Sequence, residues 1–359
     1  MSTRTELRDP ETFLQDLRFN QHFQLPADPS DDHPSLRVKY ADYGYRNQTK
    51  PEDENVLLFF APMCASRMIH VGKDELAKKY RVRIIVVDRP GFGGTEPVKL
   101  ENRAFLCRKI TLALLRHLQV RYVSVACHSG GTIYALDMIL HHPEILHPNR
   151  SYMAIGAPWI LPSHSGLWSM SLAQALPVSM MVQADKFIGF ISGTLGPVLA
   201  TSSGFSQILG TPAQPDTPRS GENDADATFE EALESILFKF VYAESIEGFS
   251  DESLFLMQKV GGIAGWGDWL DYDDLVPKLV EALKRAGRKL TIDVFFAKED
   301  NMIGAAGSQG PKWLDSCWEK DEVKEVITYN TQVINGANHN TIWSIRQGVP
   351  ESVLQKLSA

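Results

Sequence analysis

The segment from Val123 to Ala135 constrains the fold more than any other stretch of this 359-residue chain. An apolar, β-branched run breaks at Ser129-Gly130-Gly131 and continues with the spacing of a helix. Such a strand-to-helix turn lifts the serine hydroxyl out of the backbone and turns the first amides of the helix toward the same point. The pattern predicts a serine nucleophile at a sharp elbow. An ordinary strand-to-helix turn is the alternative, because small residues around a serine also occur in such turns.

The positions two before and two after this serine should be small, so that strand and helix can approach closely. Here they hold Cys127 and Gly131. Cysteine is larger than glycine, so the assignment depends on finding a base and an acid elsewhere in the chain.

A serine nucleophile needs a general base, and the base needs an acid that orients it. Two strands expected at 290–296 and 323–334 are each followed by a polar segment. The first segment contains Asp300 and the second contains His339. The order Ser129, Asp300, His339 is therefore nucleophile, acid, base. Glu299 adjoins Asp300, and adjacent residues at a strand end point in opposite directions, so only one of the two carboxylates can face His339.

Apolar runs alternate with helical patterns along most of the chain, which predicts a mostly parallel sheet covered by helices on both faces. The expected strands are 36–45, 56–60, 82–87, 123–129, 152–155, 290–296 and 323–334, and the expected helices are 73–80, 102–118, 131–141, 273–286, 311–320 and 340–357. Residues 160–269 interrupt this alternation. The organisation predicted is an N-terminal extension on the surface, a core in two pieces, and a helical lid with an exposed loop: 1–35, 36–159 with 270–359, and 160–269 with 211–228.

Together these features resemble the α/β-hydrolase family over nearly all of the chain outside residues 1–35 and the insertion. Residues 61–66, Ala-Pro-Met-Cys-Ala-Ser, are similar to the family loop His-Gly-x-x-x-Ser, and residues 88–93, Asp-Arg-Pro-Gly-Phe-Gly, to the turn after its fourth strand. The resemblance implies an α/β-hydrolase fold with an oxyanion hole made by the amides of Met63 and Gly130. Proline replaces the family glycine at position 62 but leaves the amide of Met63 available.

The family's spacing also selects Asp300 over Glu299 as the acid. The Cys-His-Ser elbow is similar to that of fungal intracellular hydrolases, some of which act in secondary-metabolite pathways. In such an elbow the side chain of His128 points away into the fold, which favours a structural role for it.

The insertion carries more large apolar side chains than a surface loop needs, so it should cover either the core or a ligand. We expect Phe187 and Phe190 to contact the substrate. Trp266 and Trp269 lie where the insertion rejoins the core. They can line the substrate pocket or pack against the core, and the sequence does not separate the two.

Composition excludes several other classes of protein. A net charge of −8 and the lack of clustered Lys and Arg argue against nucleic-acid binding. Four scattered cysteines form neither a disulfide framework nor a zinc site. No apolar run reaches the roughly 18 residues of a membrane span, and the charged first residues do not form a secretory signal. We therefore expect a cytoplasmic protein without metal or cofactor. The sequence leaves its oligomeric state open.

The function expected is a cofactor-independent serine hydrolase that cleaves a carboxylic ester, lactone or thioester of a small apolar molecule. The same three residues could instead support acyl transfer, amide cleavage, or a lyase or cyclisation step, and the fold cannot choose among these. A protein that uses the pocket only to sense a ligand is the alternative of another class.

Overall fold

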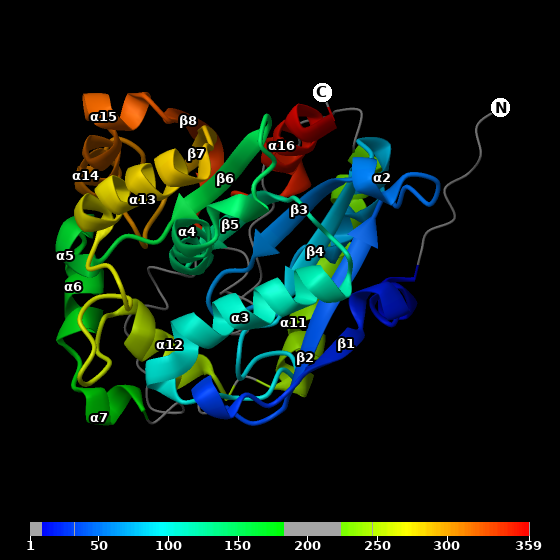
Figure 1. Ribbon diagram of the computed structural model, residues 1–359, viewed down its shortest axis with the longest axis horizontal. Coiled ribbons are helices and arrows are strands. Elements are labelled where there is room, and N and C mark those ends of the chain that lie inside the picture. Colours follow the sequence, from blue (N-terminus) through cyan, green and yellow to red (C-terminus); the bar gives the residue numbers. More distant parts are fainter. Residues whose placement is uncertain (1–8, 32, 183–223, 246, 359) are drawn as a thin grey trace.

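A mixed, mostly parallel sheet runs through the middle of the protein in the computed structural model, which describes residues 9–31, 33–182, 224–245 and 247–358 (Figure 1). The sheet has eight strands in the order β1-β2-β4-β3-β5-β6-β7-β8. β2 pairs antiparallel with β1 and with β4, and every other neighbouring pair is parallel. The strands are β1 (Gln21–Leu25), β2 (Leu36–Gly44), β3 (Asn55–Phe60), β4 (Val82–Val87), β5 (Ser124–Ser129), β6 (Ser151–Pro158), β7 (Leu290–Glu299) and β8 (Ile327–Asn338).

Helices cover both faces of this sheet. One face packs against α3 (Arg103–His117), α4 (Gly131–His141), α13 (Tyr272–Ala286), α14 (Gln309–Trp318) and α15 (Asp321–Lys324). The other packs against α1 (Pro10–Leu14), α2 (Asp74–Lys79), α11 (Asp224–Glu244) and α16 (Val349–Ser358). The described 3-10 turns are η1 (Leu17–Phe19), η2 (Pro29–Asp31), η3 (Pro51–Asp53), η4 (Val71–Lys73), η5 (Leu100–Asn102), η6 (Pro143–Ile145) and η8 (Ile345–Gln347).

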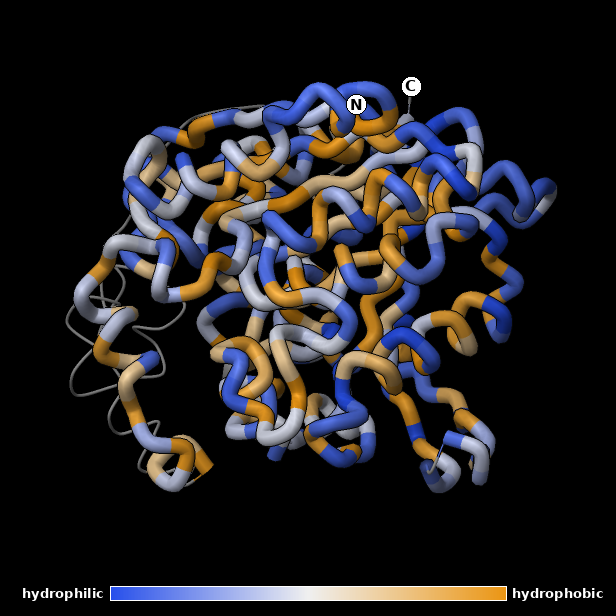
Figure 2. Tube along the Cα trace, turned by 60° about the vertical axis from the view of Figure 1, so that its left-hand side comes forward, coloured by the Kyte–Doolittle hydropathy of each residue, from blue (hydrophilic) through white to orange (hydrophobic). Residues whose placement is uncertain are grey.

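Strand β3 explains why the central strands are apolar without alternation. Val56, Leu58 and Phe60 belong to the hydrophobic cluster on one face, and Leu57 and Phe59 belong to the cluster on the other. Successive side chains of a strand point to opposite faces, so a strand covered on both sides is apolar along most of its length. The hydropathy colouring of Figure 2 follows this arrangement, with hydrophobic stretches running through the interior.

Most of the predicted elements are present within a few residues, and β4 has the predicted bounds. Two differences lie near the C-terminus. Residues 323–324 end the short helix α15, so β8 begins only at Ile327. The closing helix starts at Val349 and not at residue 340, because Gly348 adopts a left-handed φ of 74° that a continuous helix does not allow.

The N-terminal extension is more than a surface wrap, contrary to our prediction for residues 1–35. β1 pairs with β2 as the edge strand of the sheet. Its Phe23 and Leu25 are buried while His22 and Gln24 are exposed, which is the alternation of a half-buried strand. That five-residue pattern is short and polar enough to be missed in the sequence.

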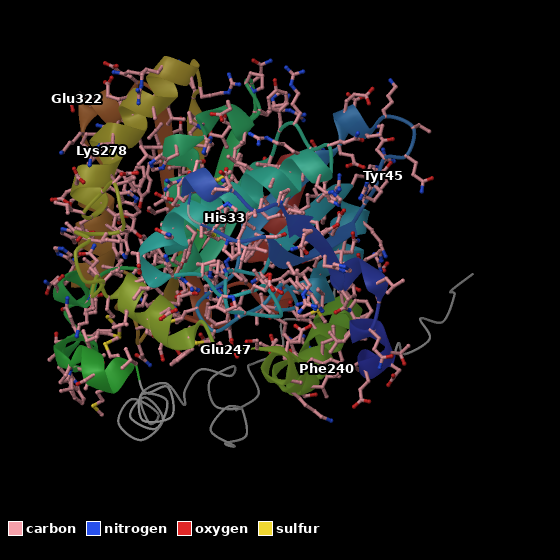
Figure 3. All side chains as sticks on the ribbon, turned by 60° about the horizontal axis from the view of Figure 1, so that its bottom comes forward. His33, Tyr45, Phe240, Glu247, Lys278 and Glu322 are labelled. Carbon is pink, nitrogen blue, oxygen red and sulfur yellow. The ribbon has the colours of Figure 1, made fainter. Side chains whose placement is uncertain are left out.

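The insertion between β6 and α13 is helical, with α5 (Pro162–Ser165), α6 (Trp168–Ala175), α7 (Val178–Met181), α11 and α12 (Phe249–Leu256) described. Residues 224–228, expected to end an exposed loop, form the first turn of α11, while 211–223 lie outside the described residues. α11 packs beside α1 on the second face of the sheet, and α12 lies close to the β5–α4 elbow. Glu247, labelled in Figure 3, belongs to the junction between α11 and α12. None of the helices described is both long and apolar enough to cross a bilayer.

Candidate active site

The elbow between β5 and α4 has the strained geometry that a nucleophile turn requires. Ser129 adopts a left-handed φ of 50°, which is costly for a residue other than glycine. A Cβ added to Gly131 would lie 2.3 Å from the carbonyl oxygen of Phe60, so only glycine lets the helix approach β3 this closely. Cys127 is accommodated: its Sγ lies 3.7 Å from the Thr132 hydroxyl, and burial raises the pKa of the thiol to about 12. The thiol therefore stays protonated beside Ser129.

Ser129, His339 and Asp300 form one hydrogen-bonded chain. His339 Nδ1 lies 2.8 Å from Asp300 Oδ2, and His339 Nε2 lies 2.8 Å from Ser129 Oγ. A carboxylate only accepts hydrogen bonds, so Nδ1–H donates to Asp300, and Nε2 is left to accept the serine proton. Each of the three residues is at most 4% exposed. This is the arrangement in which a histidine can deprotonate a serine.

The carboxylate of Asp300 is held in place by the backbone that follows it in the chain. Asp300 Oδ1 accepts hydrogen bonds from the amides of Met302 at 2.8 Å and Ile303 at 2.9 Å, which leaves Oδ2 for the histidine. Glu299 is exposed at the end of β7. Of the two adjacent carboxylates, the structure therefore brings Asp300 and not Glu299 to His339.

His128 supports the loop that carries His339. Its side chain is buried, and its Nε2–H donates a 2.7 Å hydrogen bond to the backbone carbonyl of His339. The sequence indicated a structural side chain at this position but not its partner. A histidine next to the nucleophile was the available signal, but its partner lies in a loop 211 residues further along the chain.

The two amides expected to form an oxyanion hole lie close together. A Cβ built on Gly130 would be 3.5 Å from the backbone nitrogen of Met63. Gly130 caps the N-terminus of α4, where backbone N–H groups lack partners within the helix. Among the described residues, the Met63 amide donates to none. With no partner among the residues that the structure describes, both groups could bind an anionic oxygen near Ser129.

Helix α12 of the insertion closes over this region. The Leu256 side chain is fully buried and approaches Gly130. Its backbone carbonyl accepts a 3.2 Å hydrogen bond from the indole of Trp159, just after β6. A segment that is far from the elbow in the sequence thus packs against it.

The remaining predictions for the lid concern two phenylalanines and two tryptophans. Phe187 and Phe190 lie outside the described residues. Trp266 and Trp269 are fully buried, with ring centroids 4.8 Å apart, and both pack on Tyr272. Their burial in the core beside α13 supports packing, one of the two roles that the sequence left open for them.

A group of possible metal ligands lies away from the triad. Asp28, Asp31 and His33 bring their ligand atoms within 4.8 Å of one another. Figure 3 labels His33, which marks the position of the group. The Lys109 ammonium already bridges the two carboxylates, at 2.6 Å from Asp28. A cation there would have to displace this lysine. Among the described residues, none of the three is hydrogen-bonded to Ser129, His339 or Asp300. A reaction without metal or cofactor stays a prediction.

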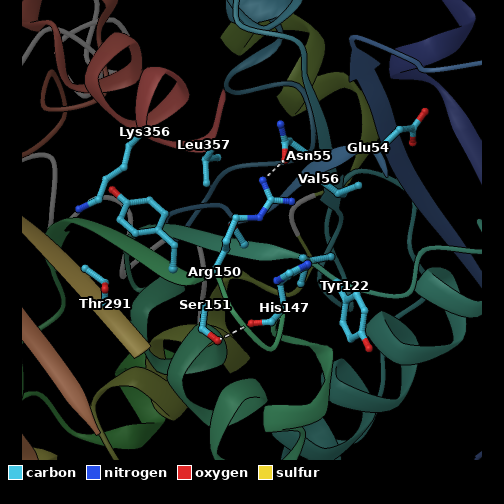
Figure 4. Close-up of a pocket in the computed structure, with 13 residues that line it drawn as sticks. Glu54, Asn55, Val56, Tyr122, His147, Arg150, Ser151, Thr291, Lys356 and Leu357 are labelled. Carbon is cyan, nitrogen blue, oxygen red and sulfur yellow. Dashed lines mark hydrogen bonds between the residues drawn. The ribbon is translucent and has the colours of Figure 1, made fainter. Parts of the chain in front are cut away.

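A pocket of about 160 Å³ lies at the amino ends of the parallel strands. Figure 4 shows the residues that line it. It is lined by Asn55, Ser124 and Ser151, the first residues of β3, β5 and β6. The triad residues instead sit at or just beyond the carboxyl ends of β5, β7 and β8, where ligands of parallel sheets usually bind. This pocket is therefore separate from the candidate active site.

No family model and no characterised sequence matched the chain. Solved structures did. An esterase from Thermogutta terrifontis is 16% identical, with 93% of this chain and 96% of that chain covered and a TM-score of 0.53. An enol-lactonase from Burkholderia xenovorans is 13% identical, with 90% and 97% covered and a TM-score of 0.53. An epoxide hydrolase from Vigna radiata is 14% identical, with 95% and 98% covered and a TM-score of 0.51.

The narrower resemblance to fungal hydrolases gains no support from these neighbours. At such low identity the structural similarity shows the fold and not the reaction. The strand order, the elbow at Ser129 and the helices on both faces agree with it. This chain has the α/β-hydrolase fold.

Proposed function

We propose that this protein is a serine hydrolase that cleaves a carboxylic ester, lactone or thioester of a small apolar molecule. The observation that carries the proposal is the buried chain of hydrogen bonds from Ser129 through His339 to Asp300. Burying polar groups and straining the backbone both cost folding free energy, and such strain is typical of functional sites.

In the proposed reaction Ser129 Oγ attacks the substrate carbonyl while His339 Nε2 takes its proton. Asp300 holds the imidazole in the required tautomer and stabilises the imidazolium that forms. The amides of Met63 and Gly130 bind the oxyanion. His339 then returns the proton to the leaving alcohol or thiol, and an acyl group remains on Ser129. Water activated by His339 attacks this acyl-enzyme and releases the acid and the free serine.

The substrate class follows from what surrounds the serine. Leu256 places an apolar side chain beside the elbow, and the nearby insertion is rich in further apolar residues. The esterase and the enol-lactonase among the structural neighbours act on carboxylic acid derivatives by name, which supports the same class of substrate here. The four cysteines are free, which fits the cytoplasmic location that we propose.

Several other uses of the site stay open. The triad could pass its acyl group to an acceptor other than water, cleave an amide, or support a lyase or cyclisation step. A protein that only senses a ligand would have no need of an activated serine.

The test is labelling of the purified protein with a fluorophosphonate probe, followed by assays on ester, lactone, thioester and amide panels. We expect stoichiometric labelling at Ser129, hydrolysis of at least one ester, lactone or thioester, and loss of both in Ser129→Ala. Absence of labelling would favour a ligand sensor. Labelling with turnover only on amides, or only with an added acceptor, would favour amide cleavage or transfer.

A further inference from the structure

Arg89, in the turn after β4, is hydrogen-bonded to the loop that carries the Met63 amide. Its guanidinium donates to the carbonyl oxygen of Ala61 at 2.6 Å and to that of Pro62 at 2.7 Å. The side chain is buried, and its charged group lies over the rings of Phe92 and Tyr134. Two successive carbonyls of the loop are thus held by one rigid, planar donor.

The hydrogen bond to Pro62 also determines where the Met63 amide points. The Pro62 carbonyl and the Met63 N–H belong to the same planar trans peptide group, in which they point in opposite directions. Fixing the carbonyl on Arg89 therefore turns the N–H away from Arg89. The nitrogen of that amide lies next to Gly130, on the side of the proposed oxyanion hole.

The charge of Arg89 is balanced by the insertion. Glu252, on α12, is fully buried; its Oε2 accepts a 3.1 Å hydrogen bond from Arg89 Nε, and its Oε1 lies 2.7 Å from Arg89 Nη2. The loop carbonyls are neutral, so without Glu252 the guanidinium would lack its counter-charge. A buried charge that loses its partner is strongly destabilised.

The insertion reaches this point through a close contact with the turn that contains Arg89. The Gly248 amide donates to the Gly91 carbonyl at 2.9 Å, and a Cβ on Gly91 would lie 2.6 Å from the Gly248 backbone. Only glycines let the two segments approach this closely. α12 begins at the next residue, Phe249, so the contact sets where Glu252 lies.

We infer that Arg89 and Glu252 are positioning residues for the oxyanion hole: α12 supplies the carboxylate that holds Arg89, and Arg89 orients the Met63 amide. This inference rests on the proposed function, because it assigns the amide to the oxyanion. In this inference α12 does more than cover the substrate, because its Glu252 also holds Arg89 in place. The hole is complete only when this part of the insertion is docked.

Arg103 provides a matched control in the same cluster. It is buried, donates to Glu252 Oε2 at 2.8 Å and to the Tyr134 hydroxyl at 2.9 Å, and has no hydrogen bond to the 61–63 loop among the described residues. Arg89→Gln and Arg103→Gln therefore each remove one guanidinium from Glu252. Only the first also releases the loop carbonyls.

The experiment follows the Met63 amide directly in protein labelled with 15N-methionine, with its signal identified by its loss in Met63→Leu. We expect this signal to shift or broaden in Arg89→Gln and in Glu252→Gln and to keep its position in Arg103→Gln. A Met63 signal unchanged in Arg89→Gln would overturn the inference. If Arg89→Gln does not fold, Arg89→Lys decides, because lysine keeps the charge but cannot hold both carbonyls in one plane.

Steady-state kinetics on the best ester provide the second readout. Arg89→Gln should lower kcat on the order of 10²-fold with KM within about threefold, as expected when an oxyanion donor is misplaced. Arg89→Lys should recover part of the loss, and Arg103→Gln should stay within about threefold of wild type. Equal losses of kcat in Arg89→Gln and Arg103→Gln would show that both arginines only stabilise the fold and that Arg89 has no specific effect on the Met63 amide. A wild-type protein that neither labels nor hydrolyses would refute the proposed function, while the amide signal would still decide whether Arg89 orients Met63.

Discussion

The imidazole of His128 donates a 2.7 Å hydrogen bond to the backbone carbonyl of His339. A carbonyl only accepts, so Nε2 of His128 carries a proton. Burial, together with the nearby imidazole of His339, lowers the pKa of His128 to about 3, and the ring is neutral at physiological pH. The residue next to the proposed nucleophile thus fixes the loop of the proposed base without carrying charge.

This neutral histidine predicts a loss of stability in mild acid. Unfolded, His128 takes up a proton near its ordinary pKa of about 6.5; folded, it does so only near pH 3. Its contribution is therefore complete above about pH 6.5 and is lost as the pH falls from there toward 3. Between about pH 7 and about pH 5 we expect His128→Asn to remove about 2 kcal/mol of the pH dependence of the unfolding free energy. Urea unfolding at the two pH values measures this.

The exposed His22 is the matched control. His22→Asn should leave the pH dependence as in wild type. The explanation fails if His128→Asn has the same pH dependence as the wild-type protein.

The nucleophile gives the largest predicted effect on activity. Ser129→Ala removes the attacking oxygen and leaves the fold and the binding site in place, so kcat should fall roughly 10⁶-fold with little change in KM. Stopped or continuous assays on the best substrate of the panel measure it. A variant that keeps a tenth of the wild-type rate would contradict the mechanism.

The acid can be tested against its neighbour in the chain. Asp300→Asn should lower kcat by a factor on the order of 10³ to 10⁴, because the amide no longer holds the His339 tautomer that accepts the serine proton. Glu299→Gln should have little effect, since Glu299 is exposed and Asp300 makes the 2.8 Å contact. The opposite ranking in kcat would show that the acid is misassigned.

The close approach of α4 to β3 predicts a cost for any side chain at Gly131. A Cβ there would lie 2.3 Å from the Phe60 carbonyl oxygen, which belongs to the backbone and cannot move aside easily. We expect Gly131→Ala to lower the unfolding free energy by about 1 to 3 kcal/mol. Gly261→Ala is the control, because nothing lies within 4 Å of a Cβ at that glycine. Equal stability of the two variants in urea would mean that the elbow tolerates a larger residue.

An apolar lid predicts a preference for longer acyl chains. Each buried methylene contributes about 0.8 kcal/mol, so kcat/KM should rise from acetyl to at least hexanoyl esters. Phe187 and Phe190 are the predicted substrate contacts, and replacing both with serine should flatten the trend. The best activity on acetyl esters, or an unchanged trend in the double variant, would mean that these residues do not contact the acyl chain of the substrate.

The sequence alone predicted every strand of the sheet except β1, the elbow, and the three residues that meet at it. Because β3 and β4 are covered on both faces, all of their residues except Asn55 and Arg83 are apolar, and that pattern is visible in a short window. Asp300 and His339 follow strands, and in a parallel sheet the carboxyl ends of strands share one edge. Their convergence with Ser129 could therefore be predicted without knowing the packing.

The tertiary structure alone decided the pairing of charges and the placement of the insertion. Glu252 lies in a stretch that is acidic and polar around it, and nothing local indicates that it is buried against Arg89, 163 residues away. Likewise β1 joins the sheet through backbone hydrogen bonds to β2, which any sequence can make, and α11 settles on the second face beside α1. Periodicity records which face of an element is buried. It does not show which element or residue packs against that face, because a buried charge or an edge strand is stabilised by groups that the fold brings from elsewhere in the chain.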